Sequence, residues 1–263
     1  DRSSAASDVY KRQISEVYYA SEVNKHAIKQ TQLNFPNTIQ LGDVTQVDVS
    51  QLEPIDLLIG GSPCQSFSFA GKRVGMSTTD KEEIYTLNRY LELKEEGFQF
   101  EGESYLFWEY MRILTDIRKY NPNVLFLLEN VEMGKKWERV LSEAIGVYGV
   151  HINSALVSAQ NRRRIYWTNI QTRRDGLFGE LHSDIPQPVD KGILLKDILE
   201  DDVDDKFFLS DKMVSCLASR KETETFSPCK FEPFEFPYEV KCRTINQRVH
   251  KMGDADNYVC LLY

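Results

Sequence analysis

Residues 55–73 read IDLLIGGSPCQSFSFAGKR. A short apolar run, residues 55–59, leads into a Gly-Gly-Ser-Pro turn, which predicts a buried strand that ends in a loop. Cys64 follows this turn, at the carboxyl end of the strand, where open α/β sheets hold their ligands. A single cysteine is usually a small core residue. Here the rigid turn and the polar loop favour a presented thiol, which becomes a nucleophile where nearby cations stabilise the thiolate.

The sequence on both sides repeats the plan of a short apolar run followed by an amphipathic stretch, which predicts a parallel α/β sheet. We expect further strands at residues 17–20, 38–41, 124–128, 150–157 and 165–168, and helices at residues 24–32, 106–117 and 137–147. The charged residues 80–103 predict an insertion made of a solvated helix and a linker. No internal repeat is present.

Composition and charge exclude several classes of protein. The 263 residues are 41% hydrophobic, and no apolar run approaches the roughly 20 residues that cross a bilayer. The net charge of −8 means that any nucleic-acid site is a local basic patch. Five cysteines without a C-x-x-C pair argue against zinc and against a fully paired disulfide set. We therefore expect a soluble, cytoplasmic protein without a membrane segment or a metal.

Two further segments carry candidate chemical groups. Glu129 directly follows the strand at 124–128, and its alternative role is a helix cap or an ion pair. If the carboxyl group is desolvated near the cysteine loop, its pKa rises and it can donate a proton near neutral pH. In residues 160–167 (QNRRRIYW), strand alternation places Arg162 and Arg164 on one face and Arg163 on the other. The guanidinium groups of Arg162 and Arg164 can then bind one ligand. For Arg163, a solvated basic edge remains a reasonable alternative.

Two acids follow strands in the first part of the chain. Glu22 suits the hydroxyl groups of a ribose and Asp43 suits the amino group of an adenine, by the logic of nucleotide sites in such sheets. Each is weak evidence alone, because an acid after a strand is more often a cap.

Taken together and in this order, S-P-C-Q (62–65), E-N-V (129–131) and Q-x-R-x-R (160–164) resemble the DNA (cytosine-5) methyltransferases of bacterial or phage type, over about residues 15–170. The segments ASEVNKHA (20–27) and LFWE (106–109) are also similar to that family. The resemblance implies a Rossmann-like S-adenosylmethionine-dependent methyltransferase sheet with a smaller, irregular target recognition lobe.

The resemblance also implies the reaction. Cys64 would attack C6 of a cytosine flipped out of duplex DNA, and C5 would then take the methyl group of S-adenosyl-L-methionine. Glu129 would hold the N3 and amino edge of the ring, while Arg164 together with Arg162 would engage its O2 edge. The residues expected to position the substrate or brace the loops are Gln65, Ser66, Asn130 and Gln160. The sequence does not identify the base that removes the C5 proton.

The cofactor residues implied by the resemblance are Glu22 for ribose, Asp43 with Val44 for adenine, and Pro63 and Leu106 as the lining of the pocket. The target recognition lobe corresponds by position to residues 176–263, and it carries basic residues that are either phosphate contacts or scattered solubilising charges. These are Arg173 and Arg174 just before the lobe, and Lys241, Arg243, Arg248 and Lys251 within it.

Several functional alternatives stay open. The tRNA-methylating branch of the family shares the catalytic motifs, and a non-catalytic binding relative or an inactive fragment would also carry parts of them. We expect the protein to act on duplex DNA as a monomer. In restriction-modification it can have a cognate restriction endonuclease as its partner. No residue predicts the target sequence.

The two ends depart from the family pattern. Residues 1–13 are expected to be an artefact of sequencing-library preparation or a disordered tail, where the family has a strand and a Phe-x-Gly-x-Gly cofactor loop. We therefore expect residues 14–175 to form a catalytic domain without that first strand and loop, and residues 176–263 to form a recognition lobe that is itself incomplete.

This expectation predicts that the 263-residue polypeptide binds S-adenosylmethionine weakly or not at all, because the segment that wraps the methionine portion is absent. Isothermal titration calorimetry with the purified polypeptide measures this. Tight binding would refute it.

Overall fold

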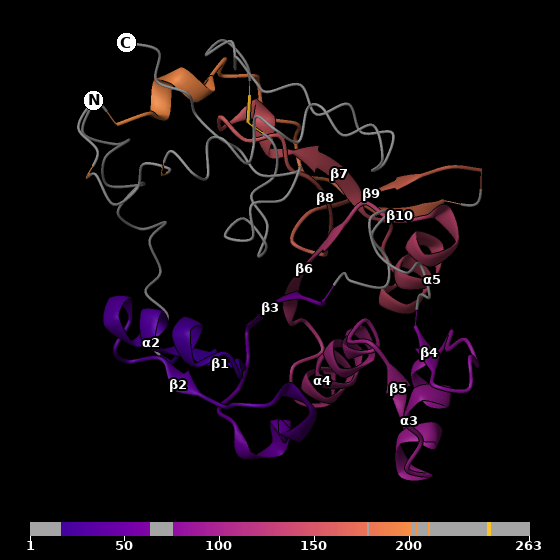
Figure 1. The fold of residues 1–263 in the computed structure, drawn as a ribbon. Helices are drawn as coiled ribbons and strands as arrows, with labels where there is room; N and C mark the ends of the chain where they lie inside the picture. Colours follow the sequence, from indigo (N-terminus) through magenta and orange to yellow (C-terminus); the bar gives the residue numbers. More distant parts are fainter. Residues whose placement is uncertain are drawn as a thin grey trace, which may run out of the picture. The chain divides into compact units, whose positions relative to one another are not determined.

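The computed structural model describes residues 17–63, 76–177 and 179–200, together with Asp204, Ser210, Lys241 and Cys242 (Figure 1). Three predicted site residues, Cys64, Gln65 and Ser66, lie outside the described residues. The same holds for residues 1–13 and for most of residues 176–263, so the predicted tail and recognition lobe remain predictions.

The described chain alternates strands with helices. The strands are β1 (Tyr19–Ala20), β2 (Ile39–Gln40), β3 (Leu57–Gly61), β4 (Ser77–Thr78), β5 (Phe100–Glu101), β6 (Leu125–Val131), β7 (Val150–Asn153), β8 (Arg163–Thr168), β9 (Thr172–Asp175) and β10 (Glu180–Ser183). The helices are α2 (Lys25–Asn34), α3 (Leu87–Glu95), α4 (Leu106–Tyr120) and α5 (Lys135–Ile145). Short 3-10 helices are η1 (Val44–Gln46), η2 (Val49–Gln51), η3 (Ser154–Leu156) and η4 (Leu195–Ile198).

The main sheet has four strands in the order β3-β6-β8-β7, and β1 pairs with β2 in a separate parallel pair. β3 and β6 are parallel, with Leu57 opposite Leu125 and Gly61 opposite Glu129. The pairs β4-β5 and β9-β10 are antiparallel. Parallel strands joined through helices confirm the predicted α/β class.

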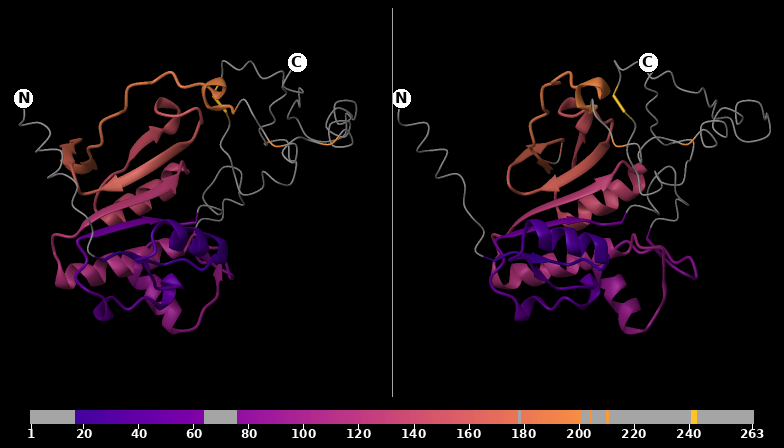
Figure 2. Two further views of the ribbon diagram at one scale, coloured as in Figure 1. Left: turned by 90° about the vertical axis from the view of Figure 1, so that its left-hand side faces the viewer. Right: turned by 60° about the vertical axis from the view of Figure 1, so that its left-hand side comes forward.

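Helix α4 packs closely on the main sheet (Figure 2). A Cβ atom added to Gly60 of β3 would lie 2.6 Å from a ring carbon of Tyr110. The guanidinium of Arg118 lies 5.7 Å from the centroid of the Phe126 ring on β6. Of the six apolar positions that the helical spacing predicts, Leu106 is half-buried and the other five are buried, namely Phe107, Tyr110, Met111, Leu114 and Ile117. The helix ends before Pro122, as predicted.

Helix α5 begins two residues earlier than predicted and ends at Gly146, whose φ of +84° is a left-handed conformation that glycine adopts without strain. The hydroxyl of Ser142 on α5 accepts a hydrogen bond of 2.9 Å from the indole N–H of Trp167 on β8. Both residues are buried. This contact attaches α5 to the sheet and satisfies the polar group of a fully buried tryptophan.

The prediction of a strand at residues 55–59 that is buried on both faces was wrong. The strand spans Leu57–Gly61, and the side chains of Leu57 and Ile59 are 45% and 58% exposed. Alternate residues of a strand face opposite sides of the sheet. Gly60 faces α4, so Leu57 and Ile59 face the other side, which the described residues leave exposed.

The predicted solvated insertion at residues 80–103 was also partly wrong. It does contain a helix, α3, with an exposed charged face. However, Ile84, Tyr90 and Leu93 are at most 1% exposed and belong to the hydrophobic core. Charged residues dominate the composition of this segment. Its apolar positions follow a short and interrupted spacing, so the sequence did not predict their burial.

The chain divides into two compact units. Unit 1 contains residues 1–150 and 165–184, and unit 2 contains residues 151–164 and 185–263. Unit 1 therefore holds α2 to α5 with β3 and β6, whereas unit 2 holds the arginine segment that leads into β8. The predicted division of function between residues 14–175 and 176–263 remains a prediction.

The close packing of α4 predicts that Gly60→Ala destabilises the protein, because its methyl group overlaps the Tyr110 ring and one of the two must move. We expect a loss of about 1–3 kcal/mol in the free energy of unfolding, measured by urea denaturation. The control is Gly134→Ala, where an added Cβ meets nothing within 4 Å and only a poorer helix N-cap is at stake. Equal effects of both changes would contradict the prediction.

Candidate functional site

The end of β3 lies beside a carboxylate of β6. Gly61 is opposite Glu129 in the parallel register, and a Cβ atom on Gly61 would lie 3.2 Å from Oε2 of Glu129. The glycine therefore leaves the space that the glutamate side chain uses. Cys64 follows Gly61 by three residues, so the chain enters the cysteine loop directly next to this carboxylate.

Asn130 connects the two strand ends. Its side chain is 1% exposed, and its Nδ2 donates to Oγ of Ser62 at 2.8 Å. Its Oδ1 accepts from the backbone N–H of Val131, also at 2.8 Å. A buried amide that uses both its donor and its acceptor orients the turn before Cys64. This is the geometry that a loop-bracing residue needs, and the role of Asn130 stays a prediction.

Ser104 holds the next residue of the turn, and the sequence analysis missed it. Its hydroxyl donates to the backbone oxygen of Pro63 at 3.2 Å, and the residue is fully buried. Ser104 stands two residues before Leu106, the first residue of α4. The structure thus brings together the predicted cofactor residues Pro63 and Leu106 at the start of this helix. The sequence signal that could have identified Ser104 is a small polar residue just before a predicted helix.

Glu22 and Asp43 lie at the same end of the β1-β2 pair. Ala20 is opposite Gln40, and the hydroxyl of Ser21 donates to the backbone oxygen of Gly42 at 2.7 Å. The two carboxylates follow directly after these positions, as expected for acids at the carboxyl ends of parallel strands.

Asp43 also acts as a cap, the alternative that the sequence left open, whereas Glu22 binds the turn before α2, whose cap is Asn24. Oε1 of Glu22 accepts from the backbone N–H of Val23 and of Asn24, both at 2.8 Å. Oδ1 of Asp43 accepts from the N–H of Thr45 at 2.9 Å and caps η1. These hydrogen bonds use one oxygen of each carboxylate.

The arginine segment belongs to unit 2. The backbone N–H of Arg162 donates to Oδ1 of Asn153 at 3.0 Å, and Nη1 of Arg164 donates to the backbone oxygen of Arg163 at 2.7 Å. Arg162 and Arg164 are half-buried and Arg163 is exposed. This alternation agrees with the predicted placement of Arg163 on the opposite face.

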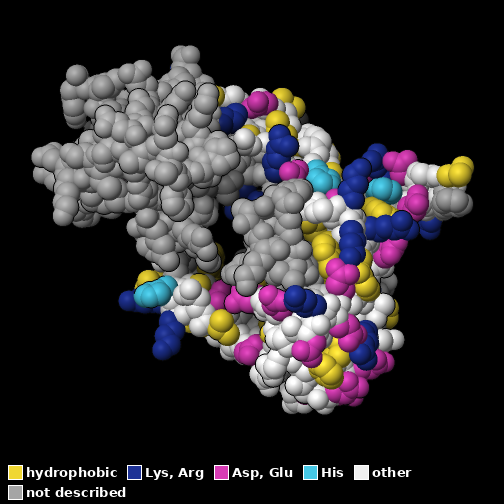
Figure 3. Space-filling view, turned by 45° about the vertical axis from the view of Figure 1, so that its right-hand side comes forward, with side chains coloured by type: hydrophobic (Ala, Val, Ile, Leu, Met, Phe, Trp, Pro, Cys, Tyr) yellow, Lys and Arg dark blue, Asp and Glu magenta, His cyan; other side chains and the backbone are white. Residues whose placement is uncertain are grey.

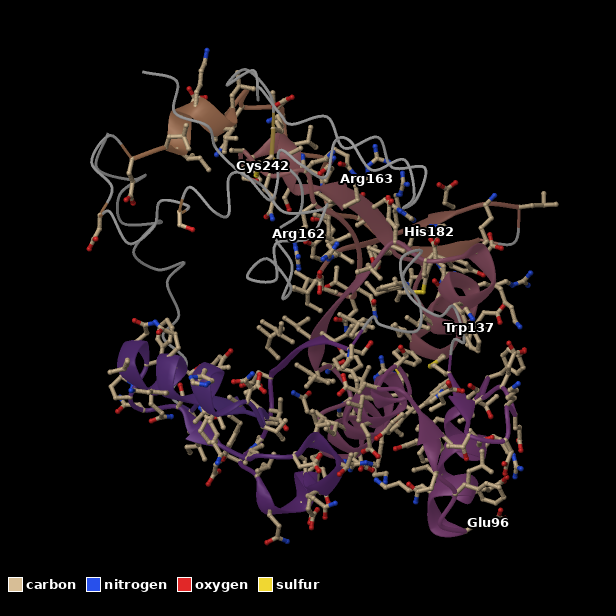
Figure 4. All side chains as sticks on the ribbon, viewed as in Figure 1. Glu96, Trp137, Arg162, Arg163, His182 and Cys242 are labelled. Carbon is tan, nitrogen blue, oxygen red and sulfur yellow. The ribbon has the colours of Figure 1, made fainter. Side chains whose placement is uncertain are left out.

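Residues 241–242 return to this segment from far along the chain, which the sequence analysis did not anticipate. Cys242 forms an isolated β-bridge with Gln160, with its N–H donating to Ala159 and its backbone oxygen accepting from the N–H of Asn161. Figure 4 shows Cys242 beside the part of the chain that carries Arg162. Burial raises the pKa of the Cys242 thiol, which makes it a poor nucleophile.

Neither of the two alternatives left open for Lys241, a phosphate contact or a solubilising charge, describes its contacts in the structure. Its ammonium donates to the backbone oxygens of Ala155, Ser158 and Ile193 and pairs with Asp190 at 3.3 Å. Its side chain is only 20% exposed. Three carbonyls and one carboxylate use the donors of this ammonium, so Lys241 holds the turn before Gln160 in place.

The arginines of β9 lie among acidic side chains. Arg173 is 3.6 Å from Asp175 and 4.0 Å from Asp184, and Nη1 of Arg174 donates to the backbone oxygen of Gly179. Figure 3 shows basic and acidic side chains close together on this hairpin. The role of Arg173 and Arg174 as phosphate contacts remains a prediction.

Within the described part of the chain, no helix combines the length and the apolar character needed to cross a membrane. The same residues contain no cluster of three His, Cys, Asp or Glu side chains that would suit a metal ion.

The family model of the C-5 cytosine-specific DNA methylases matches residues 8–258. The type II methyltransferase M1.ScrFI of Lactococcus lactis subsp. cremoris is 30% identical over 207 residues, which cover 74% of this chain and 45% of that protein. The type II methyltransferase M.NlaX of Neisseria lactamica is 29% identical over 251 residues, 89% of this chain and 68% of that protein.

A solved structure of a Spodoptera frugiperda DNMT2 variant aligns at 22% identity with a TM-score of 0.45, covering 81% of this chain and 61% of that chain. The chain spans about half the length of the curated relatives that it matches. Because the family model covers nearly all of its residues, the protein belongs to the family of C-5 cytosine-specific DNA methylases.

Proposed function

We propose that the protein transfers a methyl group from S-adenosyl-L-methionine to C5 of a cytosine that is flipped out of duplex DNA. The observation that carries this proposal is the register of β3 with β6, which sets Gly61 opposite Glu129 while Asn130 holds Ser62. A nucleophile and an acid on neighbouring strand ends are what attack on an electron-poor ring requires.

The reaction begins at C6. The Cys64 thiolate forms a bond to C6, and the electron pair of the C5–C6 double bond makes C5 nucleophilic. Glu129 stabilises the protonated N3 and holds the exocyclic amino group, while Arg162 and Arg164 stabilise the charge that develops toward O2. C5 would take the methyl group as its bond to the sulfonium sulfur of the cofactor breaks, so that the cofactor leaves as a neutral thioether. A base then takes the C5 proton, the C5–C6 double bond re-forms, the bond between C6 and the Cys64 sulfur breaks, and N3 gives back its proton.

Residues of the β1-β2 end and of the β3 turn fit the adenosine part of the cofactor. Carboxylates at neighbouring strand ends accept hydrogen bonds from ribose hydroxyls and from an adenine amino group. Glu22 would hold the ribose, Asp43 with Val44 the adenine, and Pro63 and Leu106 would line the pocket. When bound, the cofactor supplies an electrophilic methyl group.

We propose that residues 176–263 contribute to target recognition, and that Gln65, Ser66, Asn130 and Gln160 support the substrate loops. The protein acts as a monomer, as expected of an enzyme that takes a single base out of the duplex. A cognate restriction endonuclease would be a functional partner. M1.ScrFI and M.NlaX are named type II methyltransferases, which supports this context.

Covalent catalysis by Cys64 is testable with the full-length gene product. We expect it to label duplex DNA from radioactive S-adenosylmethionine, and Cys64→Ser to abolish turnover. DNA with 5-fluorocytosine at the target should form an adduct with the wild type that survives denaturation, because fluorine cannot leave as the proton does. Cys64→Ser should form no adduct.

The matched control is Cys242→Ala, since Cys242 is buried and its hydrogen bonds to the Gln160 segment are made by its backbone, which the substitution keeps. It should label DNA and form the adduct like the wild type. Labelling of tRNA in place of DNA would assign the tRNA-methylating activity, and turnover by Cys64→Ser would overturn the mechanism.

Glu129→Gln keeps the size of the side chain but removes the acid. We expect kcat to fall about 100-fold or more, because protonation at N3 is lost while the amide still fits above Gly61. Steady-state kinetics on DNA measure this. The control is Glu143→Gln on α5, whose carboxylate pairs with Arg139 at the surface. A fall of less than about threefold for Glu129→Gln would exclude its catalytic role.

A further inference from the structure

A buried carboxylate on α4 is held by three partners in unit 1. Glu109 is fully buried. Its Oε1 accepts from the hydroxyl of Tyr90 and pairs with Nζ of Lys94, both at 2.5 Å, and its Oε2 pairs with Nε of Arg112 at 2.7 Å. Burial and the hydrogen bond to Glu109 raise the pKa of Tyr90, so the phenol stays a donor. A carboxylate without these partners would be strongly unfavourable at this depth.

Both cations reach past Glu109 to the same short segment. Nη1 and Nη2 of Arg112 donate to the backbone oxygens of Val47 at 2.9 Å and Val44 at 3.2 Å. Nζ of Lys94 lies 3.4 Å from the backbone oxygen of Thr45. The charged groups of α3 and α4 thus bind three carbonyls of residues 44–47.

Residues 44–46 of this segment form η1, which Asp43 caps at its start and Val47 follows. Three carbonyls fixed from one side determine where the 3-10 helix lies and therefore where its capping carboxylate points. The planar guanidinium of Arg112 can serve Glu109 and two carbonyls at once, because its donors spread in a rigid fork. An ammonium at the same position cannot reach all three acceptors.

We infer that Arg112, oriented by Glu109, is a positioning residue for the adenine end of the cofactor site. This inference rests on the proposed function, in which Asp43 accepts a hydrogen bond from the adenine amino group. If Arg112 only stabilised the fold, its replacement would change the stability of the protein. The ratio of its affinities for S-adenosylmethionine and for an analogue without the adenine amino group would then stay the same.

The test uses Arg112→Lys in the full-length gene product, with Arg118→Lys as the matched control. Arg118 is on the same helix, and its guanidinium lies over the Phe126 ring. Equilibrium binding is measured for S-adenosylmethionine and for the analogue that lacks the 6-amino group on the purine. Thermal unfolding and kcat at saturating cofactor are measured in parallel.

We expect the wild type and Arg118→Lys to prefer S-adenosylmethionine over the analogue by about tenfold or more, the effect of one hydrogen bond to a carboxylate. Arg112→Lys should lose most of this preference, and its KM for the cofactor should rise while kcat changes little. If Arg112→Lys does not fold, Lys94→Gln should show a smaller loss of the same kind, because it releases the Thr45 carbonyl and one partner of Glu109 but keeps the two carbonyl contacts of Arg112.

An unchanged preference in a folded Arg112→Lys protein would overturn the inference, and so would an equal loss in Arg118→Lys. A wild type that binds S-adenosylmethionine but does not prefer it over the analogue would also overturn it. Failure of the wild type to bind any S-adenosyl compound or to methylate nucleic acid is a different outcome, because it refutes the proposed function itself.

Discussion

The parallel register between β3 and β6 is the constraint on which the candidate site depends. It places Gly61 opposite Glu129 and brings Ser62 within hydrogen-bonding distance of Asn130. A shift of one residue would turn Glu129 to the opposite face of the sheet and Asn130 away from Ser62, because strand side chains alternate. The backbone hydrogen bonds between β3 and β6 therefore position the acid, and the buried side chains of Asn130 and Ser104 hold the approach to Cys64.

Helix α4 links this strand end to the proposed cofactor residues. Its apolar face packs on the sheet, where Gly60 leaves space for the Tyr110 ring. Arg112, paired with Glu109 on the same helix, donates to the backbone oxygens of Val44 and Val47. A single rigid element therefore contacts the strand that leads to the nucleophile and the segment capped by Asp43. Such shared support is a direct way to hold distant groups of a site in fixed geometry.

Part of this arrangement was predictable because the signals are local. The apolar spacing of α4, the stop at Pro122 and the acids after strands each depend on neighbouring residues alone. The exposure of Leu57 and Ile59 was not predictable, since it depends on which elements cover the second face of the sheet. The contacts of Lys241 were not predictable either, since its carbonyl partners lie 48 to 86 residues earlier in the chain.

The sequence by itself determined the α/β class and the chemical groups of the site, because motifs at strand ends carry their residue types in a fixed order. The tertiary structure decided which of these groups touch. It joined Ser62 to Asn130 and Arg112 to Val44, and it set Cys242 beside Gln160. Contacts of this kind depend on strand pairing and helix packing over long separations, so local composition and spacing do not contain them.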